Sequence, residues 1–140
     1  MRRMVMFSIA GLVSAAAVAQ PTVLQLFSGR DFQPGQFSVS PVDDASRSRD
    51  GGAVNRCVIS PETLLHAGLE AADGKNCVHT IVEDTAERAT VAYSCRGLGS
   101  GRTTIIKDNR NHFTVDAQGI RGREPFAMRQ EYKRIGDCGQ

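Results

Sequence analysis

The sequence contains no tryptophan, and aromatic residues make up only 6% of its 140 residues. The core must therefore rely on aliphatic side chains, Phe and Tyr. A chain of this length forms one domain of ordinary size, which buries most of a single core but not two. Disulfides therefore matter more here than they would in a larger protein.

The sequence also lacks an apolar run long enough to span a membrane, which takes about 20 residues. Residues 1–19 instead carry two arginines, an apolar stretch from Met4 to Val13, and small residues up to Ala19. This order predicts a cleavable secretion signal. We expect cleavage between Ala19 and Gln20, because a cut one residue later would meet Pro21. Because the signal is removed, the mature chain is expected to have no membrane span. No Cys follows the apolar stretch, which argues against a lipid anchor.

An excess of charge is missing as well. Removing Arg2 and Arg3 with the signal lowers the 17 basic residues of the chain to 15, which equals its 15 acidic residues. A nucleic-acid-binding protein usually has a basic surface. We therefore expect no nucleic-acid partner.

Alternation of apolar and polar residues predicts a mainly β domain over 35–140, preceded by an N-terminal edge segment at 20–34. The expected fold is an antiparallel meander sheet with one short helix and two disulfides. The helix is predicted to start with Ser60 as N-cap and Pro61 at its first position, and to end at 73–75. A polar run at 41–52 predicts a mobile loop. The expected strands are 36–40, 53–59, 77–83, 89–95, 102–107, 112–117 and 123–134.

The four cysteines form an even set in an exported chain, which favours two disulfides. Zinc is the alternative, but zinc-binding cysteine pairs are usually separated by only a few residues, and no two cysteines here lie that close. Three pairings are possible. If Glu83 faces Ala89 and Ile81 faces Val91 in the expected hairpin, then Cys77 lies opposite Cys95 at a distance that a disulfide can span. This register predicts the pairs Cys77–Cys95 and Cys57–Cys138.

Four segments of the chain have a characteristic order and spacing: 34–39, 57–62, the hairpin 77–95 and 132–138. In these segments the chain resembles a family of exported Gram-negative bacterial proteins, the domain of unknown function 3617. The segment 132–138 is the most specific of the four. The chain differs from the family at the start of the first strand, where it has Gly35-Gln36-Phe37 and the family usually has Gly-Leu-Trp. The resemblance implies a periplasmic location and a β-rich fold, and it implies no established activity.

No residue pattern predicts a catalytic, cofactor or metal site. The glycine-rich segment 97–103 does not match the phosphate-loop motif. The first glycine of that motif would fall at position 96, which is Arg, and Arg102 stands where the motif has lysine. A strand rather than a helix is also expected to follow. The segment is predicted to be a flexible link between two hairpins. The histidines His66, His79 and His112 show no metal-type spacing, although His79 is expected to face Tyr93 across its hairpin.

The acidic residues fall mostly in predicted turns, which does not indicate paired carboxylates for acid–base catalysis. Asp137 is interpreted as a terminal hydrogen-bond acceptor beside Cys138. These turn positions are Asp43, Asp44, Asp73, Asp84 and Asp108.

The leading hypothesis is a non-catalytic binding or envelope-associated domain, whose partner is an envelope protein or a small apolar ligand. A second hypothesis is a secreted hydrolase inhibitor that presents the loop at 41–52, because small disulfide-linked β domains hold loops rigidly. An enzyme of unknown class is the third.

Overall fold

The computed structural model describes residues 24–27, 32–42, 52–69 and 76–139. The predicted signal with its cut between Ala19 and Gln20, residues 43–51 of the predicted loop, and residues 70–75 lie outside the described residues. So do Asp43, Asp44 and Asp73. The described elements are η1 (Gln25–Phe27), β1 (Gly35–Pro41), β2 (Val54–Val58), η3 (Pro61–His66), β3 (Cys77–Asp84), β4 (Arg88–Cys95), β5 (Gly99–Asn109), β6 (His112–Arg121) and β7 (Glu124–Gly136).

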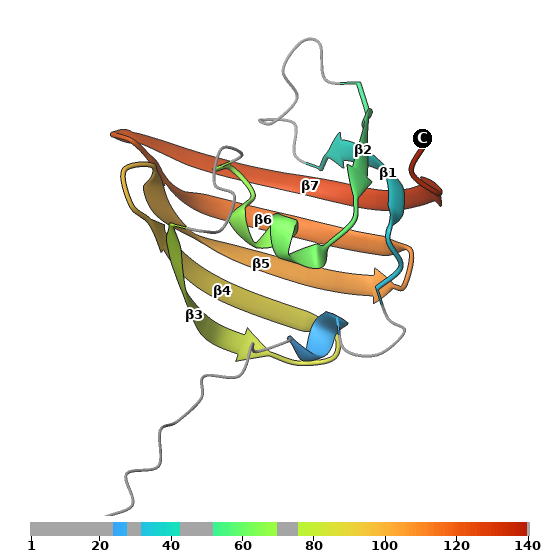
Figure 1. The fold of residues 1–140 in the computed structure, drawn as a ribbon, viewed down its shortest axis with the longest axis horizontal. Helices are drawn as coiled ribbons and strands as arrows, with labels where there is room; N and C mark the ends of the chain where they lie inside the picture. The colour runs from blue at the N-terminus through green and yellow to red at the C-terminus, as the bar shows by residue number, and fades with distance from the viewer. Residues whose placement is uncertain (1–23, 28–31, 43–51, 70–75, 140) are drawn as a thin grey trace, which may run out of the picture.

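The strands form one antiparallel sheet of seven strands in the order β2-β1-β7-β6-β5-β4-β3 (Figure 1). Strands β3 to β7 follow one another as a meander, and the β1–β2 hairpin adds to the free side of β7. The expected mainly β fold with a meander sheet is confirmed. Strands β2 and β3 occupy the two ends of the sheet.

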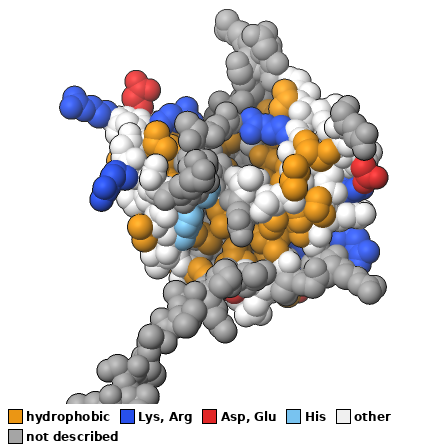
Figure 2. Space-filling model, viewed as in Figure 1, with side chains coloured by type: hydrophobic (Ala, Val, Ile, Leu, Met, Phe, Trp, Pro, Cys, Tyr) orange, Lys and Arg blue, Asp and Glu red, His pale blue; other side chains and the backbone are white. Residues whose placement is uncertain are grey.

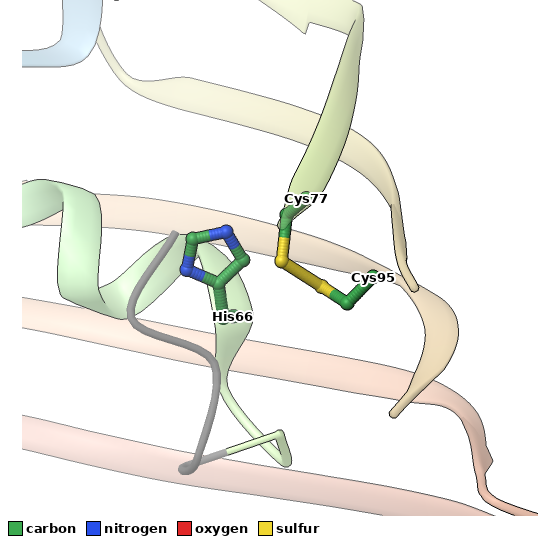
Figure 3. A group of neighbouring side chains, drawn as sticks. All are labelled: His66, Cys77 and Cys95. Atoms are coloured by element: carbon green, nitrogen blue, oxygen red, sulfur yellow. A yellow bond between two sulfur atoms is a disulfide. The ribbon is translucent and has the colours of Figure 1, made fainter. Parts of the chain in front are cut away.

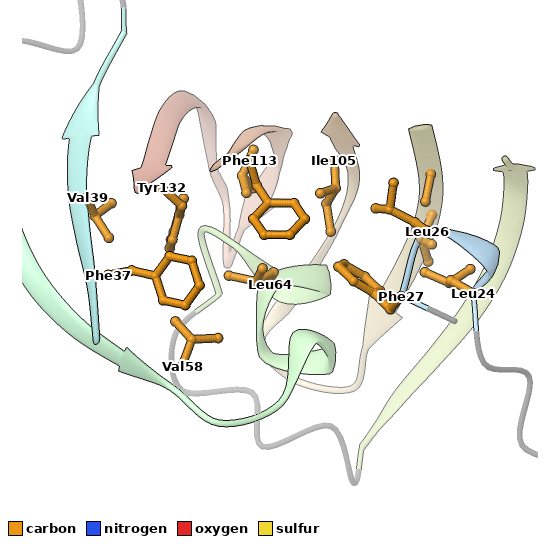
Figure 4. Packing of buried hydrophobic residues seen from close by; sticks show 13 residues of the cluster. Leu24, Leu26, Phe27, Phe37, Val39, Val58, Leu64, Ile105, Phe113 and Tyr132 are labelled. Carbon is orange, nitrogen blue, oxygen red and sulfur yellow. The ribbon is translucent and has the colours of Figure 1, made fainter. Parts of the chain in front are cut away.

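One face of the sheet carries the core, and η1 and η3 pack on that face (Figure 4). Alternation explains which side chains point there: Phe113, Val115 and Ala117 of β6 are all 0% exposed. The main cluster of buried side chains consists of Leu24, Leu26, Phe27, Phe37, Val39, Val58, Leu64, Ala89, Val91, Ile105, Phe113, Val115 and Tyr132.

The surface over η3 and the adjoining strands is rich in apolar side chains. In Figure 2 these side chains gather across the middle of the face, and Lys and Arg side chains lie around them. Among the described residues, no helix is both long and apolar enough to cross a membrane.

The described part of the expected edge segment at 20–34 contributes directly to the core. Leu24, Leu26 and Phe27 are buried. The backbone N–H of Gln25 donates a hydrogen bond to Oδ1 of Asp84 at the end of β3, over 2.7 Å. The segment therefore connects the end strand of the sheet to the core face.

The predicted helix starts where expected but is shorter and of a different type. It is a 3-10 helix that starts at Pro61, and the Thr63 hydroxyl donates to the carbonyl of Ser60 over 2.8 Å. It ends at His66 rather than at 73–75. The reason is Gly68, whose φ of +90° is a left-handed conformation that ends helices and that glycine adopts without strain.

The second hairpin has longer strands and a shorter turn than expected. Asn109 pairs with His112, which leaves Arg110 and Asn111 as the turn in place of the predicted turn at 108–111. The Asn109 side chain accepts a hydrogen bond from the backbone N–H of Asn111 over 2.9 Å. This local bond replaces a backbone turn, so the chain reverses within two residues.

Candidate functional site

Strand β3 is an end strand of the sheet and has β4 as its neighbour. Every residue from Val78 to Glu83 is exposed, including Val78 at 75%, Ile81 at 39% and Val82 at 52%. From 77 to 82 the strand contains no Asp, Glu, Lys, Arg or Pro. Natural sheets usually protect their end strands with charges, prolines or bulges. Most of β3 lacks such protection, which makes it a candidate binding edge.

A register shift between Ile81 and Glu83 interrupts β3 near its end. Ile81 pairs with Val91 as predicted, but Glu83 pairs with Thr90, and Asp84 takes the predicted place opposite Ala89. The predicted Glu83–Ala89 pair is therefore wrong. The extra residue of a bulge exchanges the two faces of a strand. It moves Glu83 off the core face and brings Asp84 to the side where it accepts the Gln25 hydrogen bond.

The start of β3 is fixed by a disulfide. Cys77 pairs with Cys95 in register and is bonded to it, with a Cα–Cα distance of 4.0 Å. The second disulfide joins Cys57 of β2 to Cys138 after β7, with a Cα–Cα distance of 5.4 Å. Both predicted pairings are confirmed. The bulge did not disturb the first because it lies beyond Ile81, on the far side from Cys77.

Side chains of the sheet hold the end of η3 in place above β4 and β5. The backbone carbonyls on both sides of His66 accept hydrogen bonds, which hold the backbone at His66 in place. Three side chains of the sheet donate hydrogen bonds to backbone carbonyls here: the Tyr93 hydroxyl to Ala67 (3.2 Å), the Thr103 hydroxyl to Leu65 (3.0 Å) and Nε of Arg121 to Gly68 (2.8 Å).

His66 and His79 meet above this part of the sheet. Their Nε2 atoms are in direct contact, and their ring centroids are 4.6 Å apart. His66 is 7% exposed, and its ring stands edge-on to Tyr93 at 5.7 Å. His79 is exposed and pairs with Tyr93, as predicted. One imidazole is thus held rigidly and the other is open to solvent.

The disulfide lies directly beside this pair. A ligand atom of His66 and the sulfurs of Cys77 and Cys95 all lie within 4.8 Å of one another (Figure 3). Sequence reasoning missed the contact between His66 and His79, because they belong to different elements and have no motif spacing. The only usable signal was that His79 and Tyr93 share the face on which the helix packs.

Glycines shape the sheet under Tyr93. A Cβ at Gly101 would lie 2.7 Å from the Tyr93 hydroxyl oxygen, and a Cβ at Gly119 would lie 2.2 Å from the backbone oxygen of Ser100. Such close approach of backbone and ring requires glycine. The predicted flexible link at 97–103 is therefore wrong: from Gly99 onward this segment is strand β5, paired with β4 and β6.

Burial raises the pKa of Tyr93 above its ordinary value of 10.0, while the Thr103 hydrogen bond and the Arg121 charge lower it. The unfolded chain then loses its phenolic proton first, so stability is full below the unfolded pKa and falls as pH rises toward the folded pKa. We expect Tyr93→Phe to remove this part of the alkaline decrease and to cost about 1 kcal/mol at neutral pH. Denaturant unfolding at a series of pH values measures both effects. Tyr132→Phe should keep the alkaline decrease, and an unchanged pH slope in Tyr93→Phe would contradict the assignment.

The third histidine lies on the face of the sheet opposite the core. His112 contacts Glu131 at 2.7 Å and Asp108 at 3.4 Å, and Lys133 contacts Glu131 at 3.1 Å. The hydrogen bonds and charges of Lys133 and His112 lower the pKa of Glu131 against a smaller effect of burial. Asp108 is half exposed, so this is a surface ion-pair network rather than a cleft. Such networks contribute little to stability.

Two other features remain as candidate sites: the Asp137 carboxylate and a hollow beside the β4–β5 turn. Asp137 accepts a hydrogen bond from Arg134, as predicted. A hollow of about 410 Å³ lies beside the turn between β4 and β5, and among the described residues that line it, Arg96 is the charged one. Neither feature combines a nucleophile with an acid or a base.

Comparison of the chain with protein-family models, with curated proteins and with solved structures finds no match in any of the three.

Proposed function

We propose that this protein is a non-catalytic binding domain of the bacterial cell envelope, exported to the periplasm, which binds an extended segment of another polypeptide along β3. The observation that carries the proposal is the uncharged, exposed edge from Val78 to Val82. Membership of the domain of unknown function 3617 family is part of the same proposal. The two disulfides support an oxidising compartment.

Strand addition fits the chemistry of this edge. A bound segment gains main-chain hydrogen bonds from the strand, and its alternate side chains provide specificity. Val78 pairs with Ser94 on the face opposite the core, whereas Ile81 pairs with Val91 on the core face. A segment with apolar side chains at alternate positions would place them all on one face, where they would cover Val78. The exposed Glu83 carboxylate favours a basic residue at the adjoining end of the segment.

A second copy of this chain fits the same edge less well. Antiparallel pairing of two β3 strands about Thr80 would set the regular half of each strand against the bulged half of the other. The bulge between Ile81 and Glu83 breaks the ladder there. A single foreign segment that follows Cys77 to Ile81 avoids this mismatch.

The other hypotheses gain less support. A small apolar ligand would need open space on the core face, but residues of η1 and η3 fill the middle of that face. The loop needed for a hydrolase inhibitor lies largely outside the described residues. For an enzyme, the described His112 and Glu131 contact lies on a strand surface without a nucleophile beside it.

The test is selection of displayed peptides against the oxidised protein, followed by affinity measurement and amide hydrogen exchange. We expect the selected peptides to be extended and apolar at alternate positions, and to protect β3 amides on binding. Val78→Lys should weaken binding about tenfold, which corresponds to ~1.4 kcal/mol. The matched control is Val54→Lys on β2, the opposite end of the sheet, where the side chain is 52% exposed.

Three outcomes would count against the proposal. Equal weakening by Val78→Lys and Val54→Lys would show that charge alone, rather than the β3 edge, affects binding. Self-association of the free protein through β3 would make a second copy the occupant. Cleavage of the bound peptide would show an enzyme.

A further inference from the structure

We propose that His66 and His79 together form a binding site for a divalent transition-metal ion of the copper and zinc class, with the neighbouring disulfide intact. This inference is independent of strand addition at β3. It rests on the contact between the two imidazole Nε2 atoms.

The two nitrogens already converge on one point. Metal–imidazole bonds are about 2.0–2.1 Å long, so two nitrogens on a tetrahedral ion lie roughly 3.3 Å apart. The observed contact is closer than this, and a small rotation of one ring makes room for an ion. His79 is exposed, so its ring can make this rotation and the ion can enter from solvent.

The other ligand is preorganised. His66 is 7% exposed, stands edge-on to Tyr93, and lies between two residues whose carbonyls accept hydrogen bonds from the sheet. Rigid support of this kind keeps a ligand in place before the metal arrives, which lowers the entropy lost on binding. The pair therefore combines one fixed and one adjustable nitrogen.

The ligand chemistry selects the class of ion. Neutral imidazoles suit copper, zinc and nickel, whereas magnesium and calcium need oxygen ligands. The group of possible ligands around His66 in the described residues contains sulfurs but no carboxylate. The sulfurs of Cys77 and Cys95 are bonded to each other and are therefore not thiolates. Water would fill the remaining positions, and Cu²⁺ should bind more tightly than Zn²⁺.

The experiment titrates the oxidised full-length mature protein with Cu²⁺ and with Zn²⁺ by calorimetry, and records the electron paramagnetic resonance spectrum of the copper form. We expect one ion per chain and a spectrum with nitrogen ligands. His79→Gln should weaken binding at least about tenfold. His79 is exposed, so this variant should fold normally, and circular dichroism checks that it does.

The matched control is His112→Gln, because His112 contacts Glu131 and Asp108 on the opposite face. Its affinity for the metal should stay unchanged, and so should that of Val78→Lys. Loss of binding in His112→Gln with binding retained in His79→Gln would overturn the proposal. Binding that appears only after reduction by a phosphine, with a sulfur-to-metal charge-transfer band, would assign the site to the cysteines and overturn it too. Absence of copper and zinc binding to the oxidised protein would also overturn the proposal.

Discussion

Replacement of both Cys57 and Cys138 by Ser should lower the free energy of unfolding by about 4 kcal/mol. The two residues are 81 positions apart, so their bond closes a long loop and removes much conformational freedom from the unfolded chain. The bond also ties the end strand β2 to the end of the chain after β7. Equilibrium unfolding in urea, with the other disulfide intact, measures the loss.

The matched comparison is replacement of Cys77 and Cys95, which are 18 positions apart. Loop entropy grows slowly with length, so this change should cost about 3 kcal/mol, roughly 1 kcal/mol less than the first. A larger loss for the Cys77 and Cys95 variant would show that packing around Cys95, which is 3% exposed, outweighs loop entropy.

Phe113→Ala should lower the free energy of unfolding by about 3–5 kcal/mol. Phe113 is 0% exposed, and its ring lies 6.2 Å from that of Phe27, 6.1 Å from Phe32 and 6.4 Å from Phe37. Removing the ring opens a cavity between the sheet and the N-terminal segment that contains Phe27 and Phe32. The chain has no tryptophan and few aromatics to fill such a space. Denaturant unfolding of the variant measures the effect.

The control for this variant is Phe113→Leu, which keeps most of the volume and should cost less than about 1.5 kcal/mol. A loss of similar size in both variants would mean that ring contacts, rather than the cavity, determine the effect. A loss below about 1 kcal/mol for Phe113→Ala would show that the surrounding core collapses into the space.

Local patterns predicted most of the sheet. Alternation located all seven strands, and the predicted pairing of Ile81 with Val91 placed Cys77 opposite Cys95, although the predicted Glu83–Ala89 pair next to the turn was wrong. Boundaries were less accurate, because hydrogen bonds to a neighbouring strand extend an element beyond its apolar pattern. Strand β5 shows this most clearly: it starts at Gly99, inside a glycine-rich stretch with no strand pattern. Contact with Tyr93 and with β6 requires those glycines.

The sequence by itself determined the mainly β class and the start of the helix at Pro61, because these depend on residue type and short-range spacing. It also predicted both disulfide pairings: the expected hairpin register paired Cys77 with Cys95, and this left Cys138, 81 positions away, for Cys57. Only the tertiary structure decided the bulge after Ile81, the helix end before Gly68 and the meeting of His66 with His79. Each of these depends on which segment packs against which face of the sheet. Contacts between distant segments are set by the packing of the whole core, and no local pattern of residues encodes them.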